Sequence, residues 1–176
     1  NARQEVSQAL LRADCFPAGM ELFPAADEEQ FEFIKTVINH SDYYVLISAG
    51  RYGSRHSETG LSYTEMEYDY AVEIGKPIIR LLHKDPFNEL RGEFIEKTDR
   101  GRRSLEQFRD KLSHRKLVKF WQNEFELGNA VDHSLRYLIK TAQATGWLPA
   151  DQIDKDAQLE NFRLKEKLNA LKAKET

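Results

Sequence analysis

Residues 42–82 decide the fold, because they contain DYYVLIS (42–48), SYTEMEYDYA (62–71) and PIIRLL (77–82) in that order. The first and last segments each hold a short apolar run with aromatic or β-branched residues, which is typical of buried parallel strands. Between them, the middle segment has the composition of a helix, and Gly75-Lys76 marks its end. The order strand, loop, helix, strand therefore predicts two parallel strands joined by a helical crossover.

The polar loop between the first strand and the helix has about a dozen residues, whereas such loops usually have about 2–6. Ligands of open α/β sheets bind at the carboxyl ends of the strands, where this loop begins. The helix after the loop carries two carboxylates, Glu65 and Glu67, in its first turns. They lie about 160° apart around a helix of about 3.6 residues per turn, so we do not expect them to act as a pair. The loop and the start of the helix are the candidate ligand site.

The sequence on either side of this stretch continues the alternation of helices and strands. Helices are expected at 3–13, from 27 to about 40, from an N-cap at Ser104, and at 125–144; strands are expected at 20–23 and 117–121. The last helix is expected to turn one apolar face inward, formed by Leu127, Val131, Leu135, Leu138 and Ile139. Residues 84–103 are charged and contain one proline and two glycines, so we expect an exposed loop there.

This alternation predicts a flavodoxin-like, three-layer α/β fold, with a parallel sheet between two layers of helices. Such a sheet normally begins with its central strand, whereas this chain begins with a predicted helix. We therefore expect a first strand to precede Asn1. The globular domain is predicted to span residues 1–148.

Residues 149–176 are predicted to form a linker and a C-terminal helix. Apolar residues recur there at alternating spacings of four and three, with one polar position, in the set Ala157, Asn161, Leu164, Leu168 and Leu171. This spacing is that of a coiled-coil seam, which predicts a homo-oligomer. An amphipathic helix that packs on its own domain is an equally good interpretation of so short a repeat.

The composition excludes several classes of function. The formal net charge is −3, which gives no overall reason to expect direct binding of nucleic acid. The mean hydropathy is −0.65, and no apolar run approaches the roughly 20 residues that span a bilayer. A single cysteine, Cys15, excludes an internal disulfide and indicates a reducing, cytoplasmic environment. The five histidines have no close metal-ligand spacing, so no metal and no cofactor are expected.

The helix that follows the long loop carries motifs of two known superfamilies. Ser62-Tyr63-Thr64-Glu65-Met66-Glu67, after a strand ending in Ser48 and a loop with Tyr52, resembles the Toll/interleukin-receptor (TIR) pattern Ser-Trp-Cys-x-x-Glu. Tyr63 and Thr64 replace the Trp and Cys of that pattern. Glu67, four residues before Ala71 and eight before Gly75-Lys76-Pro77, is similar to the catalytic glutamate of nucleoside 2-deoxyribosyltransferases. Both resemblances select Glu67.

The run from Phe16 to Trp121 resembles a bacterial TIR-like family that is labelled a domain of unknown function, and the resemblance covers about residues 3–148. It implies a domain that precedes STAND-type NTPase or repeat modules in signalling and anti-phage proteins. The activity that it implies is cleavage of the N-glycosidic bond of NAD or a related nucleotide, with NAD as a substrate.

Cleavage of an N-glycosidic bond develops positive charge on the ribose, and a carboxylate near C1′ stabilises that charge or attacks the carbon. Glu67 is the predicted catalytic residue. The predicted substrate-binding residues are Ser48, Arg51, Tyr52, Ser62 and Tyr63. The loop arginines (Arg51 and Arg55) and the helix start at Ser62 could hold phosphates, and Tyr52 could stack on a base or on nicotinamide.

Two further interpretations stay open. Glutamates at a helix start are stabilised by the helix dipole without any catalysis, and many domains of this fold only self-associate. A non-catalytic module that self-associates or binds a nucleotide within a larger signalling protein is therefore weighed equally with the enzyme. A free-standing deoxyribosyltransferase is the third option, although that enzyme would not need the C-terminal helix. Glu65, if it has a role, is expected to cap the helix start or to pair with an arginine.

Overall fold

The computed structural model describes residues 2–18, 27–115, 117–142, 144–146 and 155–172. The chain divides into two compact units, Asn1–Ala144 and Thr145–Thr176, which are described separately. The domain boundary predicted at residue 148 and the strand predicted at 20–23 both lie outside the described residues.

The first unit contains a parallel sheet of three strands, β1 (Tyr44–Ser48), β2 (Ile78–His83) and β3 (Val118–Trp121), in the order β1-β2-β3. Tyr44 lies opposite Ile78, and Arg80 lies opposite Val118. These strands confirm the strands predicted from the two apolar runs and the strand predicted at 117–121. All six residues of the central strand β2 are buried, because helices cover both faces of the sheet.

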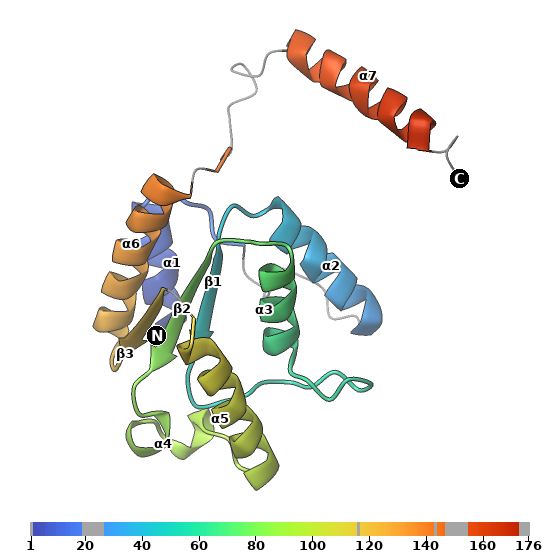
Figure 1. The fold of residues 1–176 in the computed structure, drawn as a ribbon. Coiled ribbons are helices and arrows are strands. Elements are labelled where there is room, and N and C mark those ends of the chain that lie inside the picture. The colour runs from blue at the N-terminus through green and yellow to red at the C-terminus, as the bar shows by residue number, and fades with distance from the viewer. Residues whose placement is uncertain (1, 19–26, 116, 143, 147–154, 173–176) are drawn as a thin grey trace. The chain divides into compact units, whose positions relative to one another are not determined.

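Helices form a layer on each face of this sheet (Figure 1). One layer is formed by α1 (Ala2–Arg12) and α6 (Glu124–Thr141), which contact each other closely. The other is formed by α2 (Asp27–His40), α3 (Tyr63–Glu73) and α5 (Asp99–Ser113). The described part of this unit therefore has the predicted three-layer α/β fold.

Each face of the sheet has its own hydrophobic core. The core on the α1 and α6 side includes Val6, Ala9, Ile79, Leu81, Trp121, Leu127, Val131, Leu135 and Leu138. The core on the α2, α3 and α5 side includes Ile34, Ile38, Leu46, Tyr68, Ala71, Leu82, Leu105, Phe108 and Leu112. The expectation for Ile139 was wrong, because this side chain is exposed on α6 while its four predicted companions are buried.

The predicted exposed loop at 84–103 is instead largely helical. It contains α4 (Pro86–Glu89), the 3₁₀ turn η2 (Gly92–Phe94) and the first turn of α5. The N-cap of α5 is Thr98, whose hydroxyl accepts from the Gly101 N–H at 3.1 Å. Ser104 does not cap the helix; its hydroxyl accepts from Arg55 Nη2 at 2.9 Å. This first turn was not predicted from the sequence, because it is rich in charged residues and contains Gly101. Its amphipathic pattern can be recognised only together with the rest of α5.

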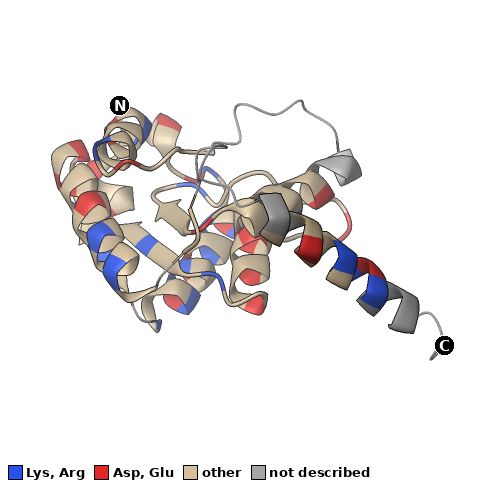
Figure 2. Ribbon diagram, turned by 90° about the horizontal axis from the view of Figure 1, so that it is seen from above, with Lys and Arg blue, Asp and Glu red and all other residues tan. Residues whose placement is uncertain are grey.

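The second unit contains α7 (Lys155–Lys172). Its described side chains, at positions 157 and 159–167, are all exposed. Acidic and basic residues alternate along this helix (Figure 2). The coiled-coil seam stays a prediction, since Leu168 and Leu171 lie outside the described side chains.

Candidate functional site

Helix α3 begins at the carboxyl edge of the sheet, where the loop that follows β1 ends. Its N-cap is Ser62, whose hydroxyl accepts from the Glu65 N–H at 3.2 Å. Ser62 is fully buried, and its neighbour Tyr63 makes an edge-on ring contact with His56 from the loop. The sequence predicted this helix start correctly, because a serine before a helical segment supplies an acceptor for the first free N–H groups.

Glu67 lies on α3, one turn after the helix start, and its partner comes from β1. The Tyr44 hydroxyl donates to Glu67 Oε2 at 3.2 Å. Burial raises the pKa of Glu67 to about 7, and the hydrogen bond from Tyr44 opposes this rise. Burial and the charge of Glu67 raise the pKa of Tyr44 well above its usual range, so Tyr44 remains a neutral donor. Glu67 is therefore a carboxyl group that can gain or lose a proton near neutral pH.

Glu65 has different partners, as its position on the helix predicts. The Tyr52 hydroxyl donates to Glu65 Oε2 at 2.6 Å, and Lys111 Nζ of α5 lies 2.9 Å from Glu65 Oε1. Lys111 also contacts two carboxylate oxygens of Asp69, at 2.6 and 2.8 Å. Glu65 therefore pairs with a lysine and not with the expected arginine. The reason is that α5 packs against α3 and carries Lys111 in its last turn.

The Tyr52 ring is almost completely buried. Arg55 lies over the ring at 4.6 Å from its centroid, and Phe108 meets the ring edge-on at 6.2 Å. Arg55 is itself held by the Gly60 carbonyl oxygen at 2.7 Å. Stacking of Tyr52 on a ligand would therefore require Arg55 and the loop to move.

Lys111 joins α3 to α5, which leads to a prediction on stability. Lys111→Met keeps the apolar stem but leaves the Glu65 carboxylate, whose side chain is 12% exposed, without its cation. We expect the free energy of unfolding to fall by about 2 kcal/mol, between the values for surface and buried ion pairs. Urea unfolding measures this loss. Adding Glu65→Gln should restore part of it, and additive effects of the two changes would contradict the coupling.

The structure does not bring the predicted site residues together around one set of contacts. Tyr52 and Ser62 meet around Glu65, while Glu67 contacts Tyr44. Ser48 is buried at the end of β1, and Arg51 is exposed in the loop. Tyr44 and Lys111 were not predicted as partners of the two glutamates, because nothing in the local sequence pattern relates them to α3.

The start of the long loop is fixed by residues that follow η2. The Glu96 N–H donates to the Gly50 carbonyl oxygen at 2.7 Å, and the Tyr52 N–H donates to Glu96 Oε1 at 2.8 Å. A side chain at Gly50 would place its Cβ in steric conflict with the carbonyl oxygen of Phe94. Glycine is required here because two segments of backbone approach each other closely.

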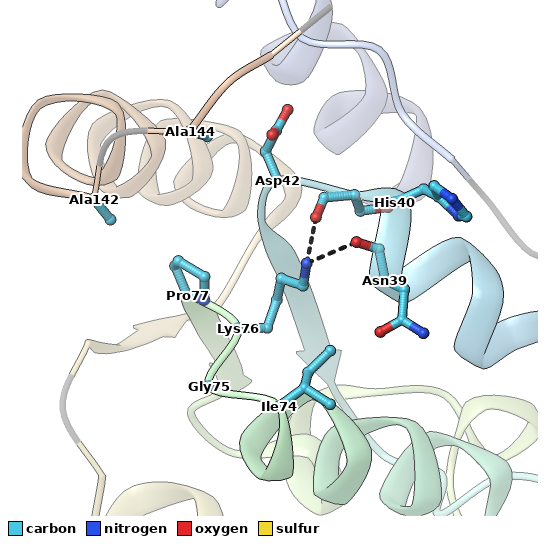
Figure 3. Close-up of a pocket in the computed structure, with 10 residues that line it drawn as sticks. Asn39, His40, Asp42, Ile74, Gly75, Lys76, Pro77, Ala142 and Ala144 are labelled. Carbon is cyan, nitrogen blue, oxygen red and sulfur yellow. Dashed lines mark hydrogen bonds between the residues drawn. The ribbon is translucent and has the colours of Figure 1, made fainter. Parts of the chain in front are cut away.

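A cavity of about 280 Å³ lies at the opposite edge of the sheet, before the amino ends of β1 and β2 (Figure 3). Its walls include residues 39–42 and 74–77. Lys76 Nζ donates there to the backbone carbonyl oxygens of Asn39, at 3.1 Å, and Ser41, at 2.7 Å. Glu67 is not among the residues that line this cavity, so the cavity and the candidate catalytic carboxylate are separate features.

The parallel sheet, its two helical layers and the long loop at its carboxyl edge define a three-layer α/β protein of flavodoxin-like arrangement. Residues 1–136 match the family described as domain of unknown function DUF4062, and the chain belongs to that family. No curated protein and no solved structure matched the sequence. Within the described residues, no helix is long and apolar enough to cross a bilayer. The same residues contain no group of three His, Cys, Asp or Glu side chains that could hold a metal ion.

Proposed function

We propose that the α/β unit is a TIR-like effector domain that cleaves the N-glycosidic bond of NAD or a related nucleotide, with Glu67 as the catalytic carboxylate. The observation that carries the proposal is the partly buried carboxyl group of Glu67, with a pKa of about 7 and one hydrogen bond from Tyr44. Perturbed carboxyl groups of this kind are concentrated at functional sites. The resemblance of residues 62–67 to the TIR pattern selects the same residue.

In the proposed reaction, the bond between ribose C1′ and the nicotinamide nitrogen breaks, and nicotinamide leaves with the bonding electron pair. Water forms the new bond to C1′ and releases a proton. The Glu67 carboxylate faces the positive charge that develops on the ribose ring and stabilises it. A carboxylate in a partly buried site is effective because little water screens its charge.

The proposed substrate site lies at the carboxyl edge of the sheet and uses Ser48, Arg51, Tyr52, Ser62 and Tyr63. Tyr52 and Glu67 have separate partners in the structure. The proposal therefore requires residues 49–61 to rearrange when the substrate binds, as loops of many enzymes do. In a larger signalling protein, an adjoining NTPase or repeat module would control this rearrangement, for example in defence against phage.

The test is to incubate the longest natural protein that contains this chain with NAD, NADP and nucleosides, and to measure release of the free base. Release of nicotinamide from NAD is the expected result. Transfer of the sugar to another base would instead indicate a deoxyribosyltransferase. If no base is released under any condition that activates the larger protein, the enzymatic proposal fails.

A non-catalytic self-association module is the second candidate, because all described side chains of α7 are exposed, including Leu159, Phe162 and Leu164. A second copy of this helix could cover the predicted seam. Under this proposal, Glu67 is a partly buried residue whose carboxylate is satisfied by the hydrogen bond from Tyr44.

Self-association through α7 has a direct test. Leu164→Glu places a charge on the predicted seam and is expected to weaken the dimer at least about tenfold. Lys165→Glu introduces the same side chain one position away from the seam and should have little effect. Analytical ultracentrifugation measures both. A parent protein that is monomeric at high micromolar concentration would contradict the coiled coil.

A further inference from the structure

The three parallel strands all end in a buried polar side chain at the same edge of the sheet. Ser48 ends β1, His83 ends β2 and Trp121 ends β3, and they are 5%, 0% and 5% exposed. Ser48 Oγ, both ring nitrogens of His83 and Trp121 Nε1 have no hydrogen-bond partner within the part of the chain that the structure describes. Buried polar groups are nearly always paired, so a set of unpaired ones at one edge indicates a missing partner.

His83 and Trp121 form the centre of this set, together with Arg109 of α5. The two rings meet edge-on with centroids 4.6 Å apart, as expected for register neighbours in β2 and β3. Arg109 Nη2 donates to the His83 carbonyl oxygen at 2.5 Å. Arg109 Nη1 is buried and, among the described residues, has no partner. Arg109 therefore reaches the end of β2 from the α5 side, while the His83 and Trp121 rings lie on the α1 and α6 side, where Leu81 packs. The charge of Arg109 acts on the His83 ring.

The charges of two carboxylates, Glu89 and Asp85, act on this cluster: both act on His83, and Asp85 also acts on Arg109. Glu89, the last residue of α4, places Oε2 3.9 Å from His83 Nε2, which is too far for a hydrogen bond. Its other oxygen accepts a hydrogen bond from Gln122. The Gln122 backbone also lies near the His83 ring without hydrogen-bond geometry. Glu89 is therefore an acidic group close to the cluster that forms no hydrogen bond with His83.

Burial lowers the pKa of His83, so the ring is neutral near pH 7 and has one N–H to donate. Arg109 contributes positive charge and Trp121 a donor that cannot accept. This donor set suits oxygen atoms that carry negative charge, because charge-assisted hydrogen bonds are the strongest that such groups form. The position also fits, since α/β sheets bind ligands at the carboxyl ends of their strands.

We propose that the ends of β2 and β3 form a binding site for an oxyanion, a phosphate or carboxylate group of a small ligand, held by Arg109, His83 and Trp121 after Glu89 is displaced. This site does not depend on Glu67 or on cleavage of a glycosidic bond. Glu89 belongs to a helix of only four residues, α4, so its displacement involves a short segment.

Trp121 provides the signal for the test. The chain has two tryptophans, so Trp147→Phe leaves Trp121 as the only one. This protein is titrated with inorganic phosphate and, separately, with acetate at constant ionic strength, with chloride as the reference. A saturable change in Trp121 fluorescence is expected with at least one of the two anions, and the stronger response identifies phosphate or carboxylate as the preferred group. No saturable change with either anion overturns the proposal.

Four further substitutions, each made in the Trp147→Phe protein, test which residues bind the anion. Arg109→Gln should weaken binding at least tenfold, whereas Arg136→Gln, an exposed arginine on α6, should not change it. Glu89→Gln removes the competing charge and should tighten binding several-fold. Glu67→Gln should leave binding unchanged, which separates this site from the proposed catalytic one. Equal affinity in Arg109→Gln and the parent overturns the proposal; if Arg109→Gln does not fold, unchanged or weaker binding in Glu89→Gln overturns it.

Discussion

Glu67→Gln is expected to lower the rate of nicotinamide release at least about a hundredfold, the usual effect of removing one preorganised electrostatic group from an active site. Glutamine keeps the shape of the side chain and still accepts a hydrogen bond from the Tyr44 hydroxyl. It lacks the negative charge that would face the ribose in the transition state. The loss should therefore appear in kcat, with little change in substrate binding.

The matched control is Glu73→Gln, which changes an exposed glutamate at the end of the same helix. It should retain the parent activity. If Glu67→Gln is as active as Glu73→Gln, Glu67 is not the catalytic residue, and the non-catalytic proposal becomes the better one.

The pH dependence of the reaction provides a second readout of the same residue. A catalytic carboxylate is active when ionised, so activity should fall as the pH drops through about 7, the pKa of Glu67. Tyr44→Phe removes the hydrogen bond that lowers this pKa, so it should move the acid limb to higher pH. An acid limb that Tyr44→Phe does not move would assign the titration to another group.

Local pattern was sufficient to predict the strands and the start of α3. Helices cover both faces of β1 and β2, so most residues of these strands are apolar. Such apolar runs can be recognised from the sequence alone. Ser62 was identifiable because an N-cap acts on residues three positions away. The separation of Glu65 from Glu67 followed from helix geometry alone, and their different partners agree with it.

Features that depend on distant segments could not be predicted. Lys111 reaches Glu65 across 46 positions of sequence, and Glu96 reaches Tyr52 across 44. Thr98 was missed as a cap because the turn after it is charged and contains Gly101, which lowers helix propensity. The sequence predicted Tyr44 only as a strand residue, whereas its hydroxyl also donates a hydrogen bond to Glu67.

The polar ends of the three strands were visible in the sequence but not interpreted together. Ser48 and His83 each follow an apolar run directly, and Trp121 ends the strand predicted at 117–121. Parallel strands bring their carboxyl ends to one edge, so three such residues lie at the same edge of any sheet of this order. Which of them lack partners depends on α4 and α5, whose placement the sequence did not reveal.

The free energy of unfolding of Glu67→Gln, relative to that of the parent protein, is expected to rise by about 3 kcal/mol between acid and alkaline pH. Burial raises the pKa of Glu67 from 4.5 to about 7, and one pKa unit corresponds to about 1.4 kcal/mol. The folded state therefore binds the proton more tightly than the unfolded state. The resulting stability is fully present below pH 4.5 and is lost as the pH rises through about 7. Glutamine does not titrate and escapes this loss.

Urea unfolding of the parent and of Glu67→Gln at pH 4.5, 6, 7 and 8.5 measures the effect. The difference between the two proteins isolates Glu67, because the other titrating groups are common to both and cancel. Glu73→Gln, where the carboxylate is exposed, should show a much smaller change over the same range. A difference that stays constant from pH 4.5 to 8.5 would mean that the Glu67 carboxylate is as well solvated in the folded domain as in the unfolded chain. The proposed catalysis would then lose its physical basis, because it depends on a charge that is held partly out of water beside Tyr44.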